Sequence, residues 1–211
     1  MDTNNILSKL EYFKIIPVVA IENADASPEL AAALIEAGLP CAEITFRTKD
    51  AASAMKKISR GNDQMLLGAG TVLKVDQVKE ASDSGAEFIV SPGFNPDVVD
   101  YCLKNNITVI PGVSTPTDIE MALGFDLSVV KFFPAESFGG IKTLKAISAP
   151  YSMMRFVPTG GININNCMEY LAFPKVLAVG GSWMAAKSLI SEGNFKEITR
   201  LTKEVMSLVQ D

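Results

Sequence analysis

Lys131 lies within the apolar stretch VVKFFPA (residues 129–135), and its position is the most informative chemical feature of the sequence. If this stretch is a β-strand, alternation places Lys131 on one face together with Val129 and Phe133. An ammonium group in such surroundings is unfavourable unless it has a partner or loses its proton. The uncharged amine is a nucleophile that forms imines with carbonyl compounds. Alternatively, the aliphatic stem packs and the charged head reaches solvent.

Glu43 is the carboxylate that we expect to face this lysine. It lies in the stretch CAEITFR (residues 41–47), which also has the pattern of a strand, with Glu43 and Arg47 on one face. If the opposite, apolar face packs against helices, Glu43 points to the same interior as Lys131. A carboxylate beside an amine can accept and return protons. The pair could equally be a structural ion pair without a role in chemistry.

Glycines and polar residues follow several other expected strands. In GAGTV (68–72) the glycines would let a ligand approach and Thr71 would supply a hydroxyl, while in SPG (91–93) Pro92 fixes a turn. PTGG (158–161) and GGS (180–182) carry glycine pairs. Their exposed N–H groups, with a following helix N-terminus, would form a phosphate-binding site. Such pairs can also serve only to relieve crowding.

The elements that must position these residues follow a regular rhythm. Eight short apolar runs predict strands at 15–21, 41–46, 65–72, 86–91, 108–113, 129–134, 155–159 and 176–180. Their starts are roughly 21 to 26 residues apart, the length of a strand, a helix and two loops. Ser27 before Pro28 and Thr115 before Pro116 predict helix N-caps, with stops at Gly38 and Gly124. Further helices are expected at 3–13 and 194–209.

Eight strand–helix units without a linker predict an α/β fold, a (β/α)8 TIM barrel with an additional N-terminal helix, rather than an open doubly wound sheet. Residues 1–211 would form one domain. Because barrel enzymes carry their chemistry at the carboxyl ends of the strands, the residues above should gather there.

Composition narrows the classes of function. The net charge of −5, with both signs scattered, argues against binding to nucleic acid or to a membrane surface. Histidine is absent, so acid–base work falls to carboxylates, lysine or tyrosine, and the commonest zinc ligand is missing. Cys41, Cys102 and Cys167 are expected to be buried, reduced thiols. We find no secretory signal and no apolar run of membrane-spanning length, so we expect a soluble, cytoplasmic protein.

Seven motifs, in one order along roughly residues 10–190, resemble the bacterial 2-keto-3-deoxy-6-phosphogluconate (KDPG) aldolases. This family includes 4-hydroxy-2-oxoglutarate (KHG) aldolases and phosphogalactonate aldolases. The motifs are EITFRT (43–48), GAGTV (68–72), SPG (91–93), PGVSTP (111–116), KFFPAE (131–136), PTGGI (158–162) and VGGSWM (179–184). Phe46, where leucine is common, and AAK (185–187) depart from the family pattern and loosen any inference about the sugar.

The resemblance implies a class I aldolase that needs no metal or cofactor, forms a homotrimer and acts in carbohydrate degradation of the Entner–Doudoroff type. It implies a Schiff base on Lys131 and general acid–base catalysis by Glu43. The substrate-binding residues that it implies are Arg47 and Thr71 at the carboxylate, Pro92 and Phe133 in the pocket wall, Thr159 for substrate preference, and Gly160, Gly161, Gly181 and Ser182 at the phosphate.

The expected substrate is a phosphorylated keto acid, cleaved to pyruvate and glyceraldehyde 3-phosphate. The galactonate analogue is an alternative, and KHG, which gives pyruvate and glyoxylate, is a further substrate to expect. Two rivals are a phosphate-binding barrel of another reaction class, such as an isomerase or a thiamine-phosphate synthase-like enzyme, and a non-catalytic oligomeric scaffold. Trp183 is either a pocket wall or, as we favour, a core side chain.

Overall fold

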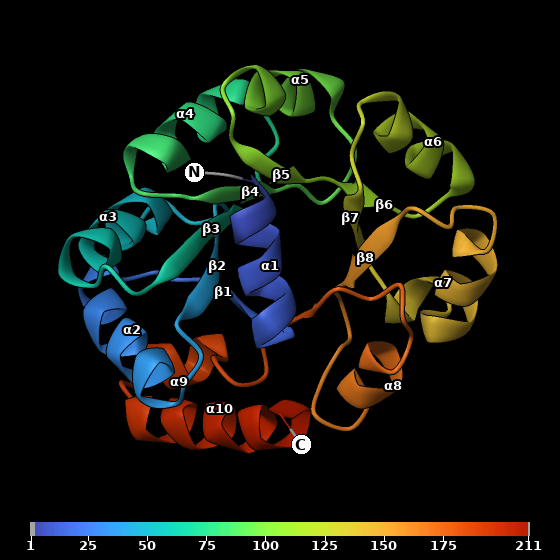
Figure 1. Cartoon of the computed structure of the whole chain (residues 1–211). Coiled ribbons are helices and arrows are strands. Elements are labelled where there is room, and N and C mark those ends of the chain that lie inside the picture. Colours follow the sequence, from blue (N-terminus) through green and yellow to red (C-terminus); the bar gives the residue numbers. More distant parts are fainter. Residues whose placement is uncertain (1–2, 211) are drawn as a thin grey trace.

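The computed structural model describes residues 3–210, in which parallel strands alternate with helices (Figure 1). The strands are β1 (Ile15–Val19), β2 (Cys41–Thr45), β3 (Leu66–Gly70), β4 (Phe88–Val90), β5 (Thr108–Ile110), β6 (Gly112–Val113), β7 (Val129–Phe132), β8 (Arg155–Pro158) and β9 (Val179–Gly181). The helices are α1 (Thr3–Phe13), α2 (Ser27–Glu36), α3 (Ala51–Gly61), α4 (Val75–Asp83), α5 (Pro96–Lys104), α6 (Pro116–Gly124), α7 (Gly140–Ser148), α8 (Cys167–Leu171), α9 (Lys187–Ser191) and α10 (Phe195–Gln210), with short 3₁₀ helices η1 (Ala24–Ala26) and η2 (Glu136–Phe138). Each of the eight predicted runs contains or overlaps an observed strand.

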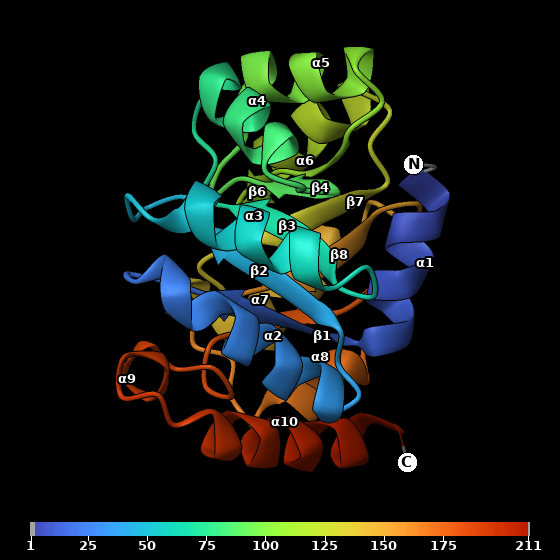
Figure 2. The same cartoon turned by 90° about the vertical axis from the view of Figure 1, so that its left-hand side faces the viewer.

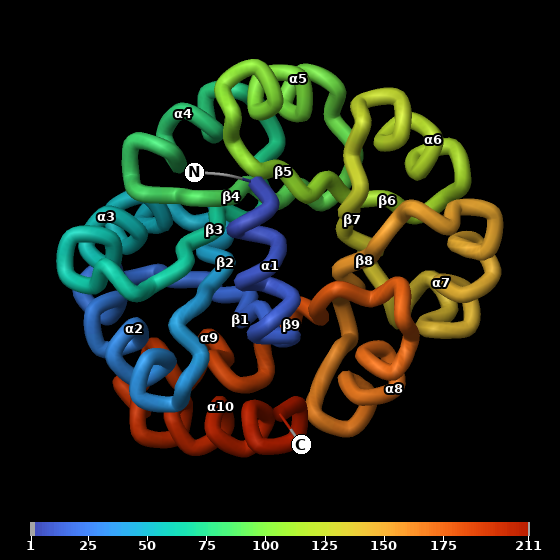
Figure 3. The backbone as a smooth tube through the Cα atoms, in the orientation of Figure 1, coloured from blue at the N-terminus to red at the C-terminus, as the bar shows by residue number. Residues whose placement is uncertain are grey.

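The strands form two parallel sheets, of order β5-β4-β3-β2-β1-β9 and β6-β7-β8. The predicted fifth strand is divided at Pro111, which has no N–H to donate to a ladder, although its carbonyl accepts a 2.8 Å hydrogen bond from the Lys131 N–H. The two sheets also approach each other between β8 and β9, where single bridges pair Phe156 with Val176 and Thr159 with Gly180. The backbone trace passes once around the strands and brings β9 beside β1 (Figure 3).

Helix α1 lies on one side of the strands, and the loops that follow β1 and β2 project from the opposite side (Figure 2). Ile6 and Leu10 of α1 are buried. Arg155, at the start of β8, donates two 2.8 Å hydrogen bonds to the Glu11 carboxylate. These bonds lower the pKa of Glu11. The predicted N-terminal helix is therefore confirmed, and it packs at the end where the strands begin.

The helix boundaries follow local chemistry, with one correction. Thr115 and Asp118 form the capping box that starts α6, which confirms the predicted cap. Ser27 is not an N-cap, because η1 runs directly into α2 and gives Ser27 helical backbone angles; its hydroxyl donates to the Ala24 carbonyl instead. Gly38 ends α2 with a φ of 79°, as predicted. Gly124 is the last residue of α6, but the left-handed residue after that helix is Asp126.

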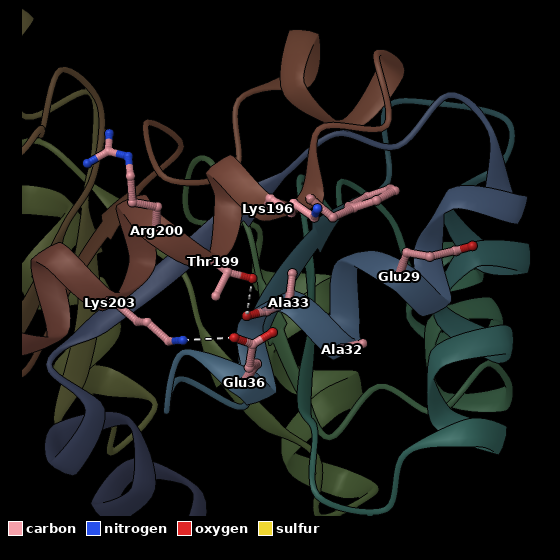
Figure 4. Close-up of a pocket in the computed structure, with 9 residues that line it drawn as sticks. Glu29, Ala32, Ala33, Glu36, Lys196, Thr199, Arg200 and Lys203 are labelled. Carbon is pink, nitrogen blue, oxygen red and sulfur yellow. Dashed lines mark hydrogen bonds and ion pairs between the residues drawn. The ribbon is translucent and has the colours of Figure 1, made fainter.

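The last helix, α10, packs beside α2. Thr199 donates a 3.3 Å hydrogen bond to the Ala33 carbonyl, and Lys203 pairs with Glu36 at 2.8 Å (Figure 4). A groove of about 560 Å³ lies between the two helices, and no predicted site residue lines it.

The three cysteines are buried and unbonded to one another, as predicted. Burial raises the pKa of the Cys102 thiol to about 12, so this group stays protonated and unreactive. Among residues 3–210 no helix has both the length and the apolar character to cross a bilayer. The prediction that no secretory signal is present rests partly on Met1 and Asp2, which lie outside the described residues.

Candidate active site

Lys131 of β7 and Glu43 of β2 meet in the interior, where Nζ lies 3.2 Å from Oε1 of the carboxylate. Only 6% of the lysine side chain and 3% of the glutamate side chain are exposed. The ring centroid of Phe133 lies 5.3 Å from the same nitrogen. The amine therefore does not extend into solvent, and the expectation that these two side chains share an interior is confirmed.

Glycines of β3 leave the space that this arrangement needs. A Cβ at Gly70 would lie 2.1 Å from Oε1 of Glu43, and a Cβ at Gly68 would lie 2.2 Å from the ring of Phe88. Strand β3 pairs directly with β2, with Gly68 opposite Glu43. These glycines leave room for the carboxylate of Glu43 and for the buried ring of Phe88. That they also let a ligand approach stays a prediction.

The pair has the geometry for proton exchange. A direct hydrogen bond of 3.2 Å joins the two groups, and nearly all of both side chains is removed from water. Transfer of one proton from nitrogen to oxygen leaves a free amine and a carboxylic acid. This arrangement can therefore supply a nucleophile and a proton carrier together.

Thr71, directly after β3, has a φ of 58°, which is rare for a β-branched residue. Its neighbours hold it in this conformation. The Val72 N–H donates to the Val90 carbonyl at 3.2 Å, and the Ser91 hydroxyl donates to the Val72 carbonyl at 2.8 Å. Backbone strain that is maintained by surrounding bonds is typical of functional loops.

Arg47 follows β2 and Pro92 follows β4, two strands of the same sheet that are separated by β3. A Cβ at Gly112 would lie 2.1 Å from the Pro92 carbonyl oxygen, and Gly112 is the residue that pairs with Lys131. Pro92 thus lies beside β6, the strand that pairs with the lysine strand β7. Arg47 is exposed in the turn after β2, and its guanidinium makes no hydrogen bond or ion pair within residues 3–210. The structure does not place it in contact with Lys131.

The two glycine pairs lie side by side, as predicted, since Thr159 bridges to Gly180. Gly160 and Gly161 have φ values of 100° and 81°, a conformation that favours glycine. Ser182 is exposed, next to Gly181.

Lack of space for a side chain explains the second glycine pair, Gly180 and Gly181. A Cβ at Gly180 would lie 2.4 Å from Oγ1 of Thr159, and one at Gly181 would lie 1.8 Å from the ring of Trp183. Trp183 thus packs on backbone; it is half-buried against the core, and its buried Nε1 has no partner within residues 3–210. Helices α8 and α9 have only five residues each, so the expected helix dipoles contribute little here.

The contacts that hold the Gly160–Gly161 loop were not predicted from the sequence. The Tyr170 hydroxyl, from α8, donates to the Glu136 carboxylate, and the Glu136 N–H donates to the Gly160 carbonyl at 3.0 Å. Burial, and secondarily Glu136, raise the pKa of Tyr170 well above its ordinary value. In the sequence, the asparagines of the segment NINN (163–166), directly after the loop, are the feature that could have indicated that side chains hold this loop.

Comparison with known proteins agrees with this geometry. The family described as KDPG and KHG aldolase matches residues 6–201. A 2-dehydro-3-deoxy-phosphogluconate aldolase of Treponema pallidum is 49% identical over 204 residues, which cover 97% of both chains. A protein of the same name from Haemophilus influenzae is 46% identical over 99% of this chain and 98% of its own.

A solved structure gives the same result. The KDPG aldolase of Legionella pneumophila, with pyruvate captured at low pH as a covalent carbinolamine intermediate, has a TM-score of 0.91 and 36% identity, covering 95% of this chain and 97% of that one. With its family motifs, its parallel strands and its buried lysine–glutamate pair, the chain belongs to the KDPG and KHG aldolase family.

Proposed function

We propose that this chain is a lyase, a class I aldolase that cleaves 2-dehydro-3-deoxy-6-phosphogluconate to pyruvate and glyceraldehyde 3-phosphate through a Schiff base on Lys131. The observation that carries the proposal is the buried Lys131 amine, 3.2 Å from the Glu43 carboxylate. The Legionella relative supports it, because pyruvate is covalently captured in that structure.

The chemistry starts with the free amine of Lys131, which attacks the C2 ketone of the substrate. Glu43, which holds the proton taken from the lysine, gives it to the departing hydroxyl, so that water leaves, a protonated imine remains and Glu43 is again a carboxylate. The protonated imine can accept an electron pair. Glu43 takes the proton of the C4 hydroxyl while the C3–C4 bond breaks, and that electron pair forms an enamine on the lysine. Glyceraldehyde 3-phosphate leaves, the enamine gains a proton at C3, and hydrolysis releases pyruvate and restores the amine.

The family resemblance supports the binding roles, and several features of the strand ends are compatible with them. Arg47, exposed and unpaired within residues 3–210, and the strained Thr71 would hold the substrate carboxylate, for which a planar guanidinium is well suited. Pro92 and Phe133 would line the pocket, and Thr159 would influence substrate preference. Gly160, Gly161, Gly181 and Ser182 would bind the phosphate.

We propose further that the two sheets are parts of one closed (β/α)8 barrel and that residues 1–211 form a single domain. Two features support closure of the barrel. Single bridges from Phe156 and Thr159 link the two sheets on one side, and on the other side only Pro111 separates β5 from β6. The resemblance to the family supports a homotrimer that acts in the cytoplasm, in sugar-acid degradation of the Entner–Doudoroff type, without nucleic-acid or membrane partners and without a cofactor.

Borohydride trapping with pyruvate tests the mechanism. We expect reduction to fix one pyruvate unit on Lys131, identified by peptide mass spectrometry, and Lys131→Met to abolish both the adduct and aldol cleavage. Lys145→Met, which changes an ammonium group of α7 outside the site, is the matched control. Full cleavage activity in Lys131→Met would refute the imine. A folded wild type that forms no adduct on Lys131 would favour a phosphate-binding barrel of another reaction class.

The substrate is tested by comparing kcat/KM for the phosphogluconate, the phosphogalactonate and the unphosphorylated KHG compounds. We expect the phosphogluconate derivative to have the highest value, because it carries the phosphate that the glycine loops would bind. A preference for the galactonate derivative would reassign the sugar and leave the mechanism intact. Equal turnover of KHG would show that the glycine loops contribute little.

A further inference from the structure

We propose that Tyr170 and Glu136 are positioning residues, which fix the Gly160–Gly161 loop so that its N–H groups are presented to the substrate phosphate. This inference rests on the proposed function. Neither residue belongs to the motif roles described above, and neither is expected to touch the reacting atoms. Their effect would be confined to substrates that carry phosphate.

Glu136 holds the loop from the side of the lysine strand. Its N–H donates to the Gly160 carbonyl at 3.0 Å, and the preceding Ala135 N–H donates to the Thr159 carbonyl at 2.8 Å. A Cβ at Gly161 would lie 2.6 Å from both Cβ and Cγ of Glu136. The stem of Glu136 therefore packs directly on the backbone of Gly161, and any rotation of this side chain is felt by the loop.

Tyr170 fixes that side chain. It is 1% exposed, and its hydroxyl donates to the Glu136 carboxylate. A Cβ at Gly140 would lie 3.1 Å from that carboxylate and 3.3 Å from the tyrosine oxygen, so the following loop also packs against the pair. Glu136 itself is exposed. Without the phenol, its negative charge would be free to turn toward a bound phosphate.

The opposite side of the loop is fixed by two amides. The Asn163 and Asn166 side-chain nitrogens each donate to the Gly161 carbonyl at 3.2 Å. The carbonyls of Gly160 and Gly161 thus both have partners, and in a trans peptide the N–H points away from the carbonyl. The N–H groups of Gly160, Gly161 and Ile162 have no partner within residues 3–210. Successive free N–H groups of this kind form an anion-binding concavity.

The test compares Tyr170→Phe with wild type, as full-length proteins, on KDPG and on unphosphorylated KHG. We expect KM for KDPG to rise roughly tenfold, the effect of losing one hydrogen bond to a charged group, with kcat within about twofold. KM for KHG should not change. Inhibition of KHG cleavage by inorganic phosphate should weaken by a similar factor.

Two sets of variants control this result. Tyr151→Phe removes another tyrosine–glutamate hydrogen bond, the exposed 3.0 Å contact with Glu120, and should leave all constants unchanged. Glu136→Gln keeps an oxygen that accepts from Tyr170 and should retain a wild-type KM or a lower one, whereas Glu136→Ala should resemble Tyr170→Phe.

Equal changes in KM for both substrates, or no change for either, would overturn the positioning role. Failure of the proposed function would look different, because the wild type itself would then form no trapped pyruvate adduct and would not cleave KDPG.

Discussion

At the scale of single residues, the central feature is the buried pair of Lys131 and Glu43, in which residues 3–210 offer each member one ion-pair partner. Lys131 and Glu43 are 5% and 2% exposed as whole residues, and a single 3.2 Å contact joins them. Removing one partner of a buried ion pair lowers the stability of the fold more than replacing both partners does, because an unpaired charge remains in the interior.

We therefore expect Lys131→Met to lower the free energy of unfolding by roughly 3 kcal/mol, because it leaves the Glu43 carboxylate without its partner. The double variant Lys131→Met with Glu43→Gln should recover most of this loss. Urea unfolding at neutral pH, followed by circular dichroism, measures both. If the double variant is no more stable than Lys131→Met alone, the pair does not stabilise the fold in this way.

Some contacts between single residues of the site could be predicted from the sequence, and others could not. A lysine and a glutamate at alternating positions of apolar runs are visible as a pair that should face one interior. The contact between Tyr170 and Glu136 joins residues 34 apart through a buried hydroxyl, and the composition of α8 does not indicate it. The reason for Gly68 and Gly70 was missed likewise, because it depends on which side chains lie across the sheet.

At the scale of elements, local hydrogen bonding decides where helices begin. The α6 capping box was predictable because Thr115, Pro116 and Asp118 are contiguous in the sequence. The start of α2 was not, since Ser27 follows a 3₁₀ turn whose own cap is Asn23.

The capping box gives stability a defined pH dependence. Burial tends to raise the pKa of Asp118, but hydrogen bonds from Ser114 and Thr115 outweigh it and leave the pKa below its usual 3.8. The ionised form therefore contributes stability above about pH 4, and this contribution is lost as the pH falls through the lowered folded value.

Asp118→Asn should accordingly be less stable than wild type by about 1 kcal/mol near neutral pH, and the difference should shrink at about pH 3. Urea unfolding at the two pH values measures it. Asp126→Asn, a change of the same chemistry after the end of α6, serves as the control. A difference that is constant with pH would mean that the Asp118 carboxylate is not the source.

At the scale of the whole molecule, the two ends of the strands have separate tasks. Lys131 and Glu43 lie within strands, and the other candidate residues lie at or after the carboxyl ends of strands. Helix α1 packs at the other end (Figure 2). The rhythm of strands and helices predicted this arrangement well. The division of the strands into two ladders at Pro111 was not predicted, because it depends on the hydrogen bonds that each neighbouring strand offers.

Burial, rather than the surface ion pair, should hold α1 in place. Leu10→Ala removes a fully buried side chain and should lower the free energy of unfolding by about 2–5 kcal/mol. Arg155→Ala breaks a partly exposed pair with Glu11 and should lower it by about 1 kcal/mol or less. In both variants kcat should be retained at a temperature where the protein is folded. If Arg155→Ala lowered the free energy of unfolding more than Leu10→Ala does, the ion pair and not burial would hold α1 in place.

The glycines of the interior also bear on how such an enzyme can diversify. At Gly68, Gly70, Gly112 and Gly180, even a methyl group would overlap a neighbouring ring, carboxylate, carbonyl or hydroxyl. Natural variation and laboratory evolution should therefore find almost no acceptable replacements on this inner wall. New substrate ranges would have to arise through exposed positions such as Ser182, while the chemistry beneath them is inherited unchanged.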